Sequence, residues 1–168
     1  MIESVALVVF PMLMIFAALF DLFTMTIPNR LSLALIGAYF ALAAYLPLPW
    51  QVVAWHLSCA IAILLLTFVM FHFRWIGGGD AKLAASTALW LGWEHLLDYG
   101  LVASLIGGAL TIAIIELRRH ELPPKILSVG FLARLADKSG GVPYGIALAL
   151  AGLFVYPHTL VWSRLAGL

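Results

Sequence analysis

Charged residues are scarce in this sequence, and their scarcity excludes most kinds of soluble protein. Of 168 residues, only 10% are charged whereas 64% are hydrophobic, and the mean hydropathy is +1.09. So little polar surface cannot cover a water-soluble globule of this size. We therefore expect an integral membrane protein that is surrounded over most of its surface by the lipid bilayer.

Cysteine is scarcer still, because Cys59 is the only one and stands inside an apolar run. One thiol builds neither an intrachain disulfide nor a zinc site with several cysteine ligands.

The net charge of +1 argues against nucleic acid as a partner. No glycine-rich nucleotide loop is recognisable, so we expect no cofactor. The histidines are dispersed too widely to predict a metal site: His56, His72, His95, His120 and His158.

Apolar runs, by contrast, are abundant and approach the length of a membrane crossing. A helix needs roughly 20 mostly apolar residues to cross a hydrocarbon core of about 30 Å. The first run follows Met1–Ser4, which lacks the basic residues of a cleaved signal peptide, so we expect this run to be kept. Proline and glycine clusters separate most of the runs. The sequence predicts one all-α membrane domain, residues 1–168, with six transmembrane helices at 5–23, 31–47, 52–73, 81–97, 99–117 and 143–162.

The basic residues predict how this bundle is oriented, because Lys and Arg are retained on the cytoplasmic side of short loops. If the six helices alternate in direction, only Arg164 of the nine basic residues falls on the membrane side that carries the chain termini. The other eight fall in the first, third and fifth connections: Arg30, Arg74, Lys82, Arg118, Arg119, Lys125, Arg134 and Lys138. These connections are therefore predicted to be cytoplasmic, with both termini outside. The longest of them, 118–142, fits a surface-lying amphipathic helix and an ordinary basic loop equally well.

Two aspartates are the candidates for chemistry. Asp21 ends the first apolar run and Asp80 begins the fourth, so two intervening crossings return the chain to the same side. A charge near the bilayer centre costs roughly 2.5 to 3.5 kcal/mol on insertion scales, so such an acid needs a partner, water or a function. Either acid alone could be a helix-end carboxylate, and Asp80 would suit a helix N-terminus. Together they could share one proton, so that one activates water while the other binds a peptide carbonyl.

The segments around these aspartates are similar to a known family. Residues 77–80 read Gly-Gly-Gly-Asp, fit a Gly-x-Gly-Asp signature and continue into Lys82-Leu83. The first acid opens a segment that ends in Pro28-Asn29, and a third likeness is Pro-Tyr-Gly-Ile-Ala at 143–147. In this order the three segments resemble the type IV prepilin peptidases, which share the signature with presenilin-type membrane aspartyl proteases.

The resemblance implies an aspartyl endopeptidase of the bacterial cytoplasmic (inner) membrane that cleaves the leader of prepilins at the cytoplasmic face. It implies contacts with the pilus assembly machinery, and it assigns Asp21 and Asp80 as the catalytic pair. The residues it implies as substrate-binding or supporting are Gly77, Gly79, Lys82 and Asn29. Larger members carry an insertion with paired Cys-x-x-Cys motifs and N-methylate the trimmed pilin. Because that insertion is missing here, the chain resembles the compact, peptidase-only branch of tight-adherence (Flp pilus) systems.

Two other functions stay open at this point. A small proton-coupled transporter could use Asp21 and Asp80 as relay groups. Such a relay would favour acids at staggered depths and a repeated architecture, and no internal repeat is evident. A noncatalytic subunit of a pilus-assembly machine is the third alternative, and it would keep its function after both acids were replaced.

Overall fold

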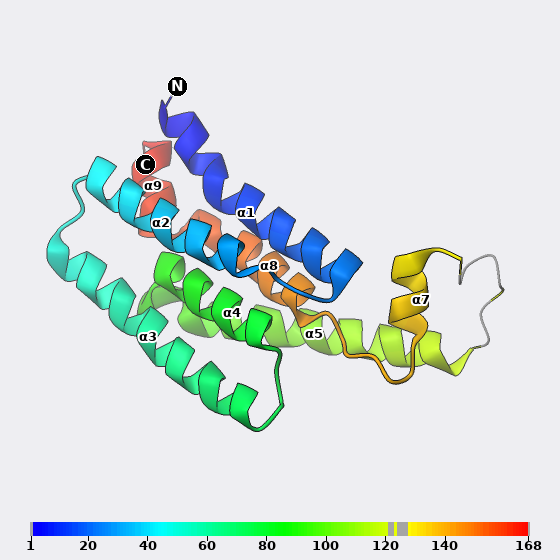
Figure 1. Ribbon diagram of the computed structural model, residues 1–168. Coiled ribbons are helices and arrows are strands. Elements are labelled where there is room, and N and C mark those ends of the chain that lie inside the picture. The colour runs from blue at the N-terminus through cyan, green and yellow to red at the C-terminus, as the bar shows by residue number, and fades with distance from the viewer. Residues whose placement is uncertain (1, 121–122, 124–127, 168) are drawn as a thin grey trace.

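The computed structural model describes residues 2–120, 123 and 128–167 (Figure 1). Within these residues every regular element is helical, which confirms the predicted all-α class. The elements are α1 (Ile2–Thr24), α2 (Asn29–Tyr45), α3 (Trp50–His72), α4 (Gly78–Leu91), the 3-10 turn η1 (Trp93–His95), α5 (Leu96–Arg119), α7 (Gly130–Ala136), α8 (Tyr144–Val155), the 3-10 turn η2 (Tyr156–His158) and α9 (Leu160–Ala166).

Proline and glycine set the starts of three of these helices. Pro28 directly precedes α2 and Pro49 directly precedes α3. Proline suits these positions because it has no N–H to leave unpaired in the first turn. Gly77 directly precedes α4. The breaks predicted before the second, third and fourth helices are confirmed.

The boundary between the fourth and fifth predicted helices is wrong. Helix α4 ends at Leu91 and not at 97, because Gly92 adopts a φ of +68°. This is the left-handed region that side chains other than glycine rarely enter. The break predicted between the helices 81–97 and 99–117 lies instead inside α5, whose first residue is Leu96.

The last predicted helix, 143–162, is also wrong as one continuous element. It is divided into α8 and α9, which meet at an angle of 56°. Pro157 lies in the 3-10 turn between them, where its missing N–H would break a continuous helix. The second piece starts anew at Thr159, whose hydroxyl oxygen accepts a hydrogen bond from the Trp162 N–H at 3.3 Å.

Three helices of the described chain are long and apolar enough to cross a membrane. They cover Ala6–Thr24, Trp50–His72 and Trp93–Arg119, and the bent pair formed by α8 and α9 would be a fourth. Helices α2 and α4, with 17 and 14 residues, are shorter than the roughly 20 residues that a full crossing needs. The structure therefore supports a multi-pass membrane protein, while the count of six crossings stays a prediction.

Helices α4 and α8 form the centre of the bundle. Helices α2 and α3 pack on α4, whereas α1 and α5 pack on α8, and the two central helices also contact each other. Trp90 of α4 is fully buried, lies 5.0 Å from the ring of Phe10 in α1 and donates a hydrogen bond to the Leu35 carbonyl of α2 at 3.0 Å. Each aromatic pair of this kind contributes about 0.5 to 1.5 kcal/mol beyond its buried area.

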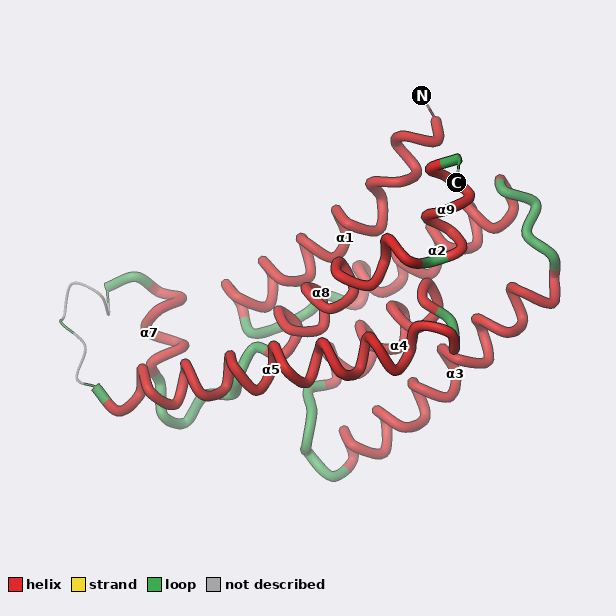
Figure 2. The backbone as a smooth tube through the Cα atoms, turned by 180° about the vertical axis from the view of Figure 1, so that it is seen from behind, coloured by secondary structure: helices red, strands yellow, loops and turns green. Residues whose placement is uncertain are grey.

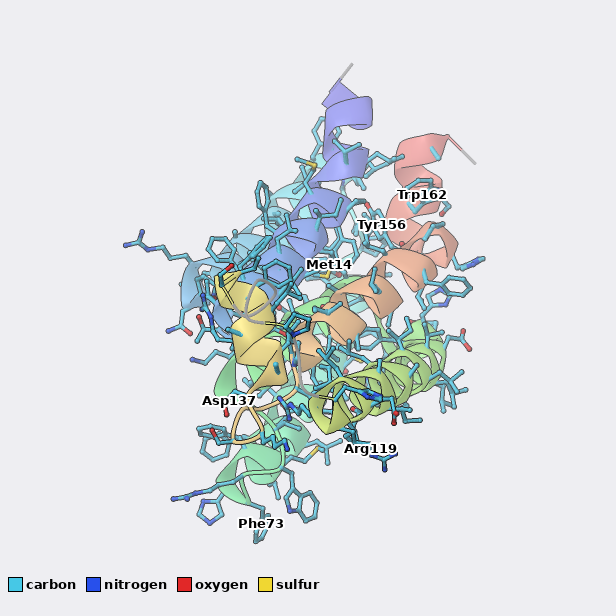
Figure 3. All side chains as sticks on the ribbon, turned by 90° about the vertical axis from the view of Figure 1, so that its right-hand side faces the viewer. Met14, Phe73, Arg119, Asp137, Tyr156 and Trp162 are labelled. Carbon is cyan, nitrogen blue, oxygen red and sulfur yellow. The ribbon has the colours of Figure 1, made fainter. Side chains whose placement is uncertain are left out.

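The ends of the helices divide the bundle into two poles. The C-terminal ends of α1, α3 and α5 and the N-terminal ends of α2, α4 and α8 gather at one pole, while both chain termini lie at the other (Figures 1 and 2). Figure 3 shows the same division, with Phe73, Arg119 and Asp137 far from Tyr156 and Trp162. We call the first of these the basic pole, because it carries Arg30, Arg74, Lys82, Arg118, Arg119, Arg134 and Lys138. Lys125, the eighth residue of this predicted group, lies outside the described residues.

The connection after α5 contains the short helix α7, which lies across the basic pole next to the end of α5 (Figures 1 and 2). Phe131 of α7 contacts Phe23 of α1 edge to face, with 5.4 Å between ring centroids. Arg118 binds the return of this connection, because its Nε donates to the Leu135 carbonyl at 2.9 Å and its Nη2 to the Gly141 carbonyl at 2.8 Å. Whether α7 rests on a membrane surface stays a prediction.

Candidate active site

The fold brings the two predicted acids to the basic pole. Asp21 lies in the last turn of α1, and Asp80 is the third residue of α4. The two side chains are close enough that the charge of one acts on the other. Helices separated by more than fifty residues of sequence thus supply one pair of carboxyl groups.

Asp21 is the more deeply buried member of the pair, with 4% of its surface exposed. Its carboxyl group faces the backbone N–H groups of Gly145 and Ile146 in the first turn of α8. The Ile146 N–H also donates to the Pro143 carbonyl at 3.3 Å, and both N–H groups carry part of the positive dipole of α8. The Oδ2 atom has no hydrogen-bond partner among the described residues. A buried oxygen left free in this way calls for an explanation, and a role in proton transfer is one.

Asp80 is only partly buried and interacts with the start of its own helix. Its carboxylate faces the backbone N–H of Gly77, the residue that directly precedes α4. This is the helix-capping arrangement that the sequence allowed for Asp80 on its own. A Cβ at Gly77 would lie 2.9 Å from the Asp80 Oδ2, so only glycine leaves the carboxyl group in this position.

The segment between α1 and α2 closes the site from a third direction. Ile27 of this segment is buried, and a Cβ at Gly79 would lie 3.1 Å from its Cβ. A Cβ at Gly145 would lie 2.6 Å from the Ile27 Cδ1 and 2.7 Å from the Asp21 Oδ2. Gly79 and Gly145 therefore let α4 and α8 approach this segment and the acids beside it.

Gly145, Ile146 and Ile27 are site residues to which the sequence interpretation assigned no role. The segment 143–147 was recognised as a likeness to a family, but no role was predicted for any of its residues. A glycine within that segment was the available signal for Gly145. Ile27 lies in the other family-like segment, which begins at Asp21, but nothing there distinguishes it from the apolar residues around it.

The two polar residues predicted to support the site bind each other. The Lys82 Nζ of α4 donates a hydrogen bond to the Asn29 Oδ1 of α2 at 2.8 Å. Both line a mainly apolar groove of about 420 Å³ between α2, α3 and α4. No ion pair between Lys82 and either carboxylate occurs among the described residues. Any support that Lys82 gives to the acids would therefore act through the packing of α2 against α4.

A cleft of about 390 Å³ opens beside Asp80 between α3, α4, α5 and α8. Asp80 lines this cleft, whereas Asp21 does not, so the two acids differ in their access to a bound molecule. One wall is fixed by a hydrogen bond of 3.0 Å between the Thr111 and Tyr144 hydroxyl groups. Within the described residues, no three His, Cys, Asp or Glu side chains gather as a metal ion would require.

These features define a helical membrane protein with a pair of carboxyl groups at one pole of its bundle. Residues 8–112, which include both acids, match the type IV leader peptidase family, and the chain belongs to this family. It is 31% identical over 141 residues to a prepilin leader peptidase/N-methyltransferase of Aeromonas salmonicida (strain A449), covering 79% of this chain and 42% of that protein. A protein of the same name from Dickeya chrysanthemi is 34% identical over 126 residues, covering 70% of this chain and 42% of the relative.

The chain thus spans about two fifths of the length of these two relatives, since 42% of each is matched. A third relative of the same name, from Aeromonas hydrophila, is 35% identical over 77 residues, or 46% of this chain and 21% of that protein. No solved structure shows significant similarity to the chain.

Proposed function

We propose that this protein is a membrane aspartyl endopeptidase that removes the leader peptide of type IV prepilins. The observation that carries the proposal is the meeting of Asp21 and Asp80 at one pole, in a chain that belongs to a family of leader peptidases. The printed names of its relatives describe the same cleavage.

The chemistry follows from two neighbouring carboxyl groups that share one proton. The ionised group takes a proton from a water molecule, whose oxygen attacks the carbonyl carbon of the peptide bond. The protonated group donates a hydrogen bond to the carbonyl oxygen and stabilises the tetrahedral intermediate. When the C–N bond breaks, the leaving nitrogen receives the proton that came from the water. Asp80, which lines the cleft, would contact the peptide directly.

The proposed setting is the bacterial inner membrane, with the acids at the cytoplasmic face, six crossings and both termini outside. The support is that the described basic residues of the predicted cytoplasmic connections share a pole with the two acids. The proposal has three finer parts. The substrates are prepilins of the Flp type, the protein contacts the pilus machinery, and it does not transfer methyl groups. In this chain the single cysteine, Cys59, is buried in α3, so paired thiolates are not supplied by the described residues.

The test is coexpression of the protein with candidate prepilins in membranes, followed by N-terminal sequencing of the shortened product. Asp21→Asn and Asp80→Asn should each abolish processing while the protein still accumulates, because one carboxyl group cannot both activate water and donate a proton. Asp98→Asn is the matched control, since this exposed acid lies in the first turn of α5 at the opposite pole. Wild-type processing by either site variant would refute the proposal.

The same variants separate the two rival functions. Proton flux in liposomes that both Asn substitutions abolish, without any cleavage by the wild-type protein, would favour a transporter. A fully functional double variant in pilus assembly would favour a noncatalytic subunit.

A further inference from the structure

We propose that the cleft beside Asp80 binds the apolar transmembrane segment of the substrate, and that Gly108 determines which side chains of that segment fit. This inference rests on the proposed peptidase function. It goes beyond it by placing the uncut part of the substrate and by naming a residue that selects among substrates.

The position of the cleft supports this assignment. Helix α3 packs mainly on α4 and helix α5 mainly on α8, and α3 and α5 contact each other little. The cleft lies between them, with Met70 on the α3 side and Gly108 on the α5 side. The outward faces of both flanking helices are apolar and exposed, as Phe68 (62%) and Leu105 (74%) show. In a bilayer such faces contact lipid, so a substrate helix could enter the cleft sideways without leaving the membrane.

The direction of the cleft fits a helix that continues from a cut bond. Asp80 lies at the start of α4, and Ala84, which also lines the cleft, lies one turn farther from the basic pole. Helix α5 runs in the opposite direction, so Ser104 lies one turn, about 6 Å, farther from the basic pole than Gly108. The cleft therefore extends from the acid toward the apolar middle of the bundle, which is where the segment after the leader must go.

Gly108 is singled out by the free space around it. A Cβ at the neighbouring Gly107 would lie 3.2 Å from the Tyr144 ring, so that glycine is needed for packing within the protein. A Cβ at Gly108 would meet no atom within 4 Å, although this residue lines the cleft. Its missing side chain thus serves no contact within the described residues and leaves room for a ligand. Small residues of this kind allow helices in membranes to approach closely.

The experiment compares Gly108→Leu with Gly100→Leu. Gly100 lies in the same helix, also has no atom within 4 Å of its Cβ position and does not line the cleft. Both variants should fold and accumulate alike. Since a single misfitting methylene group in an apolar pocket costs tenfold or more, G108L should raise the KM for prepilin by roughly tenfold or more. G100L should stay within about twofold of the wild-type value, because the substitution lies outside the pocket.

A complementary change in the substrate completes the test. A set of prepilins is prepared in which each large residue after the cut site is replaced singly by alanine. At least one of these substrates should be cleaved by G108L as well as by the wild-type protein. A general structural defect would not be rescued by any of them. If the wild-type protein cleaves prepilin and G108L shows the same KM, the cleft assignment is wrong while the peptidase proposal stands. If the wild-type protein cleaves no prepilin, both fail.

Discussion

Replacement of Gly145 by alanine should inactivate the protein without unfolding it. The added Cβ would lie 2.6 Å from the Ile27 Cδ1, 2.7 Å from the Asp21 Oδ2 and 2.9 Å from the Asp21 Cγ. Distances below 3.0 Å do not occur between such atoms, so the carboxyl group or the start of α8 must shift. Overpacking of this kind costs about 1 to 3 kcal/mol of stability. A displacement of about 1 Å in a catalytic group can cost about a hundredfold in rate.

The assay is cleavage of prepilin in detergent or membranes, with the melting temperature measured on the same preparation. Gly152→Ala is the matched control, because it lies two turns farther along α8 and its Cβ would crowd Met14 and Thr87 at 3.3 Å. This control should lose stability and keep its rate, since it touches neither acid. If G145A keeps more than half of the wild-type rate, the claim that this glycine sets the position of Asp21 is wrong.

Three further predictions concern the surroundings of the acids. Lys82→Met should lower stability by about 1 kcal/mol or less, because it removes one exposed hydrogen bond to Asn29; a loss of stability far above this, measured by thermal unfolding, would contradict it. Arg118→Ala should reduce processing and speed proteolysis near Gly141, since the side chain holds two carbonyl groups of the connection that leads into α8. Arg118→Lys cannot make both bonds, so its rate of processing should lie between those of the wild type and Arg118→Ala. Incubation with EDTA should leave cleavage unchanged, and a loss that zinc restores would indicate a metalloenzyme instead.

Much of the fold could be predicted because its helix starts depend on local chemistry. Proline before α2 and α3 and Gly77 before α4 act through the backbone of one or two residues, whatever the rest of the chain does. The stop at Gly92 and the bend at Pro157 were missed. Each is a single residue within an apolar run, and apolar character alone does not distinguish a continuous helix from a bent one.

The candidate site was predictable only in part, for a different reason. The acids are rare in an apolar chain, so Asp21 and Asp80 attract notice, and the alternation of helices places them at one pole. Gly145 and Ile27 act through a contact between segments more than a hundred residues apart. Such a contact has no local pattern, and only the folded chain reveals it.

The shortness of α4 has a consequence for the setting of the proposed hydrolysis. Its 14 residues rise only about 21 Å, which is about 9 Å less than the hydrocarbon thickness of a typical bilayer. If α4 is one of the six proposed crossings, the chain at one end of it or both must lie below the lipid headgroups, so the surrounding membrane would thin or a wet recess would form there. The supply of water to the peptide bond in the proposed reaction would then depend on bilayer thickness, a property of the host membrane and not of the protein.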